Sequence, residues 1–155
     1  MDDILTALAQ SSVASYFRSS RWGYAALNAA HIFGIGLLVG STIPLSLRLL
    51  GLWPTVGRPL LARILVPTAA VGLTVALSTG VLLFSVRAGE YAGLLVFRIK
   101  LSVIFVGIAS AVLAHLRYGI WLDRSDHRKL PEVGLVSILC WTSALVAGRL
   151  IAFVQ

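Results

Sequence analysis

Four long apolar stretches, each flanked by basic residues, constrain the fold of this chain more than any other feature. They cover about residues 22–47, 64–86, 94–121 and 133–154, and each is long enough for the roughly 20 helical residues that cross a bilayer. The chain is 58% hydrophobic and 12% charged, whereas a soluble domain carries roughly 25% charged residues. A water-soluble protein of this size could not bury so much apolar surface. The sequence therefore predicts an all-α integral membrane four-helix bundle, formed by residues 21–155.

The segment before the first stretch has a different pattern. In residues 1–20 the apolar side chains of Leu5, Leu8 and Phe17 are interspersed with acidic residues, glutamine and serines. This pattern predicts an amphipathic helix that lies in the membrane interface. A helix packed on the end of the bundle explains it equally well.

The net charge of +7 comes from basic residues near the ends of the apolar stretches. At those places they reach lipid headgroups, so we expect the bilayer, and not nucleic acid, to be the partner of this charge. Cys140 is the only cysteine, which excludes an intrachain disulfide. The chain also lacks the several Cys and Met ligands of a soft copper site.

Polar side chains inside the apolar stretches are the candidate functional residues, because such groups are costly in a membrane. Alternating chain direction brings the start of the first and third stretches to the same side as the end of the fourth. This terminal-side layer is expected to hold one histidine and three cations: His31, Arg98, Lys100 and Arg149. With little acidic charge nearby, the layer predicts a bound anionic group, such as haem propionates, a lipid phosphate or an acidic substrate.

His31 is the main candidate ligand of a haem or a metal ion. The alternative is a neutral imidazole that bonds a backbone carbonyl or Asn28, one helical turn earlier. His115 lies in the third stretch, but about eleven residues deeper, or roughly 16 Å at the helical rise. One haem does not bridge that distance comfortably. The sequence leaves open a haem on His31 with another ligand, a haem shared between protomers, and two separate sites.

Glycines in the first stretch indicate a close contact with another helix. Gly36 and Gly40 form a GxxxG pair, whose partner is expected within the bundle or in a second chain. All six acidic residues lie outside the central parts of the stretches, which argues against a carboxylate proton relay.

Several runs resemble one family. They are residues 28–40 (NAAHIFGIGLLVG) and 45–51 (LSLRLLG), followed by 97–101 (FRIKL) and 147–153 (AGRLIAF). Together they resemble an uncharacterised family of small bacterial inner-membrane proteins with four spans. The layout of one histidine per span is more distantly similar to copper-resistance D type membrane domains and to small b-type cytochrome subunits. The resemblance implies a multi-pass protein of the bacterial inner membrane, without an established activity.

Three functions follow from these observations. The first is a redox or cofactor-binding subunit in electron transport, not an enzyme on its own, with haem b or a quinone at His31, Arg98, Lys100 and Arg149, and His115 as a further candidate. The second is a non-catalytic assembly subunit that binds other membrane subunits or forms a homo-oligomer. The third is a small transporter or metal-handling protein.

Overall fold

The chain forms an all-α bundle of four long helices in a computed structural model. The structure describes residues 6–7, 9–124 and 129–154, so parts of the predicted N-terminal helix (residues 1–5 and 8) lie outside the described residues. The helices are α2 (Ser12–Ser19), α3 (Arg21–Leu49), α4 (Arg58–Val86), α5 (Ala88–Gly93), α6 (Leu95–Tyr118) and α7 (Leu130–Val154). The four long ones, α3, α4, α6 and α7, are long and apolar enough to cross a membrane. This confirms the predicted fold class.

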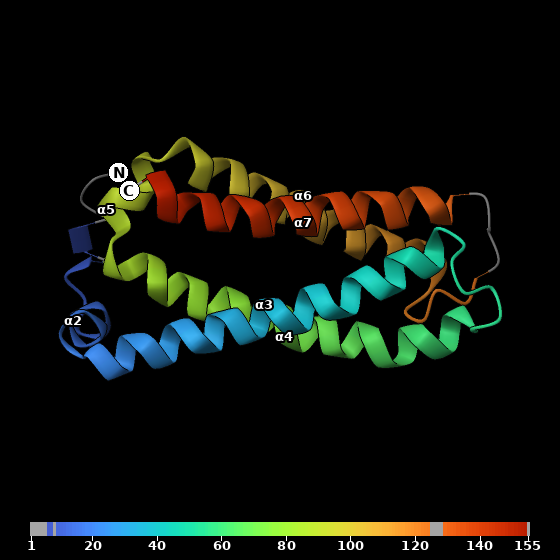
Figure 1. Ribbon diagram of the computed structural model, residues 1–155, viewed down its shortest axis with the longest axis horizontal. Helices are drawn as coiled ribbons and strands as arrows, with labels where there is room; N and C mark the ends of the chain where they lie inside the picture. Colours follow the sequence, from blue (N-terminus) through green and yellow to red (C-terminus); the bar gives the residue numbers. More distant parts are fainter. Residues whose placement is uncertain (1–5, 8, 125–128, 155) are drawn as a thin grey trace.

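The long helices pack as two hairpins. α3 packs on α4 and α6 packs on α7, and contacts between α3 and α7 join the two pairs. Both chain ends lie at one end of the elongated bundle, together with α2 and α5 (Figure 1). In the described parts of the chain, no Cα atom of α4 lies within 8 Å of a Cα atom of α6. The two hairpins therefore approach each other closely along α3 and α7 and stay further apart along α4 and α6.

Most of the bundle surface is apolar. In α6 only 6% of the apolar 18-residue window is buried, and Phe105 at its middle is 73% exposed. Such a surface is stable next to lipid hydrocarbon and not in water. The structure thus agrees with a multi-pass membrane protein.

Two glycines set the crossing of α3 and α4. A Cβ atom added to Gly34 would lie 2.7 Å from the backbone nitrogen of Ala76, and one added to Gly72 would lie 2.5 Å from the backbone nitrogen of Leu38. These distances are too short for any side chain, so the two backbones touch where only glycine fits. Gly36 and Gly40 have nothing within 4 Å of an added Cβ. Among the described residues, the predicted GxxxG pair therefore has no neighbouring helix packed against it.

The helix boundaries differ from the sequence-based ranges mainly at α4. This helix begins at Arg58 instead of near residue 64, with Gly57 as its N-cap. Pro59 lies in the first turn, where proline lacks no hydrogen bond that the helix needs. Similarly, Pro44 is accommodated inside α3, which continues to Leu49. The C-terminal end of α6 is followed by Gly119, whose φ of 86° is a backbone conformation that favours glycine.

The end of the bundle far from the termini is closed by a small apolar cluster. Its buried members come from all four long helices and a loop: Leu49, Ala62, Ala114, Tyr118, Leu122 and Leu130. Nearby, Arg48 closes the loop between α3 and α4, because its guanidinium donates to the carbonyls of Val56 and Pro54 at 2.6 and 3.2 Å.

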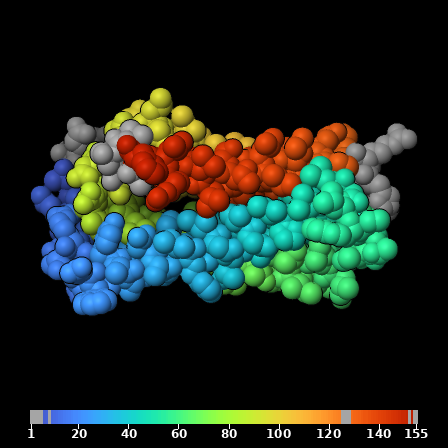
Figure 2. All heavy atoms as spheres, in the orientation of Figure 1, coloured from blue at the N-terminus to red at the C-terminus, as the bar shows by residue number. Residues whose placement is uncertain are grey.

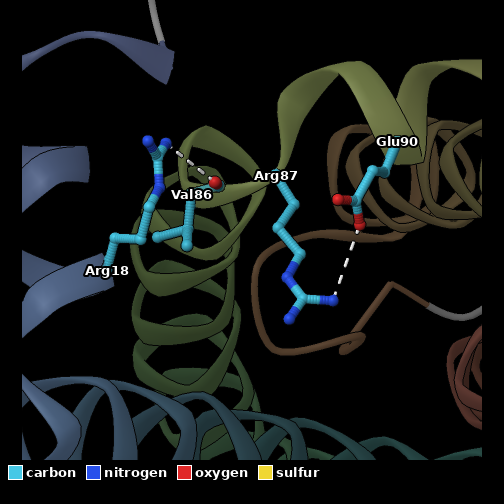
Figure 3. Close-up of polar contacts among 4 residues, drawn as sticks. All are labelled: Arg18, Val86, Arg87 and Glu90. Atoms are coloured by element: carbon cyan, nitrogen blue, oxygen red, sulfur yellow. Dashed lines mark hydrogen bonds and ion pairs between the residues drawn. The ribbon is translucent and has the colours of Figure 1, made fainter.

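The short helix α2 packs across the opposite end of the bundle. Its Ala14 is 0% exposed, and the Arg18 guanidinium donates to the carbonyl of Ala9 at 2.9 Å. The same guanidinium donates to the carbonyl of Val86 at 3.0 Å (Figure 3). Val86 is the last residue of α4, so the cation satisfies a carbonyl at the negative end of that helix. Beside it, Arg87 and Glu90 form an exposed ion pair of 3.5 Å. In the described residues α2 is thus a helix docked on the bundle.

We expect Arg18→Ala to loosen α2 without unfolding the bundle. The variant loses two hydrogen bonds from a charged donor, each worth about 1.5–3 kcal/mol. Amide hydrogen exchange of Ser12–Ser19, followed by mass spectrometry in lipid nanodiscs, should accelerate at least tenfold. Arg21→Ala is the control, since Arg21 is exposed. Equal exchange in both variants would mean that Arg18 does not hold the helix.

Candidate functional site

The first candidate site is a cavity of about 460 Å³ between α3, α4, α6 and α7. It lies in the half of the bundle near the chain termini, where a hollow separates α3 from α7 in the space-filling view (Figure 2). The walls are mainly apolar. The polar exceptions are Tyr24, Asn28 and His31 from α3, Tyr91 from α5 and Lys100 from α6. A mainly apolar cavity with a few convergent polar groups is the usual form of a small-molecule site.

His31 is held by α4. Its Nδ1 lies 2.9 Å from the Thr79 hydroxyl oxygen, and that hydroxyl donates to the Val75 carbonyl at 2.6 Å. We infer that the Thr79 hydroxyl donates its single proton to Val75, so that the Thr79 oxygen accepts from His31 and Nδ1 carries a proton. In the neutral imidazole the other nitrogen, Nε2, is then unprotonated and can accept a hydrogen bond or bind a metal.

Two glycines make room for the polar side chains of the cavity. A Cβ atom added to Gly80 of α4 would lie 3.1 Å from Cε1 of His31. One added to Gly148 of α7 would lie 3.3 Å from Nζ of Lys100. The imidazole and the ammonium group therefore each rest against a helix backbone, on two different hairpins.

An aromatic wall lines the cavity between α4 and α6. The Phe84 and Phe97 rings are stacked with their centroids 5.2 Å apart and their planes 5° apart. The Tyr91 ring also stacks on Phe97, with the two centroids 5.9 Å apart. All three residues line the cavity. Since the backbones of α4 and α6 do not touch, these rings form the side of the bundle at this depth.

The structure brings together two of the four predicted terminal-side residues. His31 and Lys100 line the same cavity. Arg98 is exposed and its Nε donates to the Ala92 carbonyl at 3.2 Å. Arg149 is exposed as well, and its guanidinium carbon lies 5.1 Å from the ring centre of Phe153. Neither arginine lines the cavity.

His115 lies in a second cavity, of about 260 Å³, in the half of the bundle away from the termini. The two cavities share only a wall formed by Leu38, Leu73 and Trp141. The two histidines are therefore separated in depth, which is the arrangement that the sequence-based depth difference predicts. Of the alternatives that the sequence left open, this geometry favours two sites.

Sequence reasoning missed three residues that shape the first cavity, Thr79, Gly80 and Gly148. The sequence predicts Asn28 or a backbone carbonyl as the partner of His31. The structure adds the Thr79 hydroxyl of α4, and the backbone of Ala76 also hydrogen-bonds the imidazole. Threonines in apolar helices usually bond their own backbone, and Thr79 also does so. Its second role depends on which helix faces α3, and the sequence carries no signal of that.

The cavity fits haem poorly. Among the described residues it offers His31 but no second imidazole and no sulfur ligand. The described part of the chain also contains no group of three His, Cys, Asp or Glu residues placed to hold a metal ion. Haem propionates would find one cation, Lys100, inside the cavity. Comparison of the chain with protein-family models, with curated proteins and with solved structures found no match.

We expect Thr79→Val to change the protonated nitrogen of His31. The variant keeps the side-chain shape but removes the acceptor for Nδ1–H, so the imidazole is free to place its proton on Nε2. The ¹⁵N chemical shifts of His31 in histidine-labelled protein report which nitrogen is protonated. Thr74→Val is the matched control, because Thr74 is an exposed threonine of the same helix that bonds only the Ala70 carbonyl. Unchanged His31 shifts in Thr79→Val would refute the proposed tautomer.

Proposed function

We propose that this protein is a cofactor-binding subunit of a bacterial inner-membrane redox complex, and that it holds a quinone in the His31–Lys100 cavity. The observation that carries this proposal is the convergence of one imidazole and one ammonium group in an otherwise apolar, aromatic-walled cavity. The bound molecule should therefore combine an apolar ring with hydrogen-bonding groups at its edge.

A quinone meets each of these requirements. Its carbonyl oxygens accept hydrogen bonds, which the Lys100 ammonium can donate. In the reduced form its hydroxyl groups donate, and the unprotonated Nε2 of His31 is an acceptor. The flat ring suits a wall made of Phe84, Phe97 and Tyr91, since aromatic rings favour stacked or edge-on contacts with one another. A partner subunit would supply or remove the electrons.

Haem b on His31 remains an alternative cofactor for the same cavity, although the residues present fit it less well. Analysis of the protein purified under mild conditions distinguishes a bound quinone from a bound haem b. We expect no Soret band in the visible spectrum and a stoichiometric quinone in the organic extract, identified by mass spectrometry. A Soret band that disappears in His31→Ala would show that the cofactor is haem b and not a quinone. An extract with neither cofactor would contradict the proposal.

A second candidate function, a non-catalytic assembly subunit, is supported by the outer surface of α3. Gly36 and Gly40 are exposed, with open space around both, and the neighbouring Phe33 is 64% exposed. A helix of another subunit, or of a second copy, can approach closely at such a pair. Native mass spectrometry should then show that the complex loses its partner in Gly36→Leu. A partner that is retained in this variant would contradict the assembly function.

A further inference from the structure

The cavity around His115 contains a polar group that the fold leaves unsatisfied. Nδ1 of His115 is buried and has no hydrogen-bond partner among the described residues. A buried nitrogen without a partner is unfavourable, and the cost is not reduced inside a membrane, where bulk water is absent. The nitrogen therefore points to a ligand that completes its hydrogen bonding.

Hydroxyl groups line part of the same cavity, whose wall is otherwise mainly apolar. Besides His115, its polar lining consists of five hydroxyl side chains from three helices: Ser41, Thr42, Ser46, Ser110 and Ser137. Ser41 and Ser46 are buried, with 3% and 2% exposure. Thr42 donates its proton to the Leu38 carbonyl at 2.8 Å, so towards the cavity it can only accept. The wall thus presents both donors and acceptors.

The chemistry of the wall restricts the ligand class. No Asp, Glu, Lys or Arg side chain lines this cavity in the described residues, so an ion there would be uncompensated in a low-dielectric bundle. A hydroxyl group can donate to a bare Nδ1 or accept from a protonated one, and so it suits either tautomer of His115. The volume of about 260 Å³ greatly exceeds the roughly 10–15 Å³ that one water molecule needs.

We propose that the His115 cavity is a second, independent site that binds small neutral hydroxylic molecules, either a water cluster or a small polyol. The wall of Leu38, Leu73 and Trp141 separates it from the His31 cavity, so its occupant does not have to be the ligand bound there. The proposal does not rest on quinone binding.

Nuclear magnetic resonance of ¹⁵N-histidine protein in lipid nanodiscs tests this site. His115→Leu assigns the His115 signals. The wild-type protein should show a hydrogen-bonded Nδ1 shift for His115 and magnetisation transfer to it from water, or from added glycerol if a polyol is bound. His31, whose Nδ1 bonds Thr79, is the internal reference for a hydrogen-bonded shift. A His115 shift of a free nitrogen, without transfer from water or glycerol, would overturn the proposal.

A filling variant checks that the signal arises in the cavity. Ser137→Val places a methyl group in the site and should reduce the transfer to His115 at least threefold. Ser143→Val is the matched control, because Ser143 belongs to the same helix, is exposed and does not line the cavity. An equal transfer in the two variants would locate the exchanging molecules elsewhere and contradict the assignment.

Discussion

Gly72→Ala should destabilise the bundle by about 3 kcal/mol, near the upper end of the cost of overpacking a well-packed core. The added methyl group would meet backbone atoms of α3: the nitrogen of Leu38 at 2.5 Å and the carbonyl oxygen of Gly34 at 2.8 Å. Backbone atoms cannot rotate away as a side chain can, so the two helices must separate. Thermal unfolding in detergent micelles, followed by circular dichroism or by retention of the monodisperse fraction, measures the loss.

Gly36→Ala is the control for this prediction. It introduces the same methyl group into an apolar helix at a position with nothing within 4 Å. Alanine favours a helix over glycine by about 1 kcal/mol, so this variant should be neutral or slightly more stable. Similar stability of the two variants would mean that α3 and α4 do not cross at Gly34 and Gly72.

Lys100→Met should weaken the binding of a short-tailed quinone by 10- to 100-fold. The variant removes one hydrogen bond from a charged donor, worth about 1.5–3 kcal/mol, and each 1.4 kcal/mol is a factor of ten in affinity. Methionine keeps most of the side-chain volume against Gly148. Equilibrium titration of the protein in nanodiscs measures the change. His31→Ala should cause a loss in the same range.

Arg98→Met provides the comparison. It removes a positive charge from the same end of the same helix, but from a side chain that is exposed and outside the cavity. The quinone affinity of Arg98→Met should stay within twofold of that of the unmodified protein. If Arg98→Met and Lys100→Met weakened binding equally, the effect would come from the overall charge of this layer and not from a contact in the cavity.

The number and approximate position of the membrane helices could be predicted from the sequence because hydropathy and length decide them. The side of each helix that faces the bundle could not. The long helices are apolar all round, so no polar face marks the exterior, and the glycines on both sides of α3 look alike in the sequence. Contact geometry shows Gly34 in the helix crossing and Gly36 outside it.

The same limitation explains the partial prediction of the site. Depth along a helix follows from counting residues, which brought His31, Arg98, Lys100 and Arg149 to one layer. Rotation about the helix axis decides which side chains enter the cavity, and it separates the two arginines from the other two residues. His115 was correctly expected at a different depth, since that also depends only on counting.

The central claim, that a quinone binds between His31 and Lys100, is tested most directly through Trp141, which lines the cavity and is buried. A variant with Trp22, Trp53 and Trp121 changed to Phe retains this single fluorophore. Titration with a short-tailed quinone in nanodiscs should quench its fluorescence saturably, and Lys100→Met should shift the midpoint at least tenfold. A variant that keeps only the exposed Trp22 should show quenching that rises linearly with the quinone concentration in the membrane. The same linear rise for Trp141 would contradict quinone binding in the cavity.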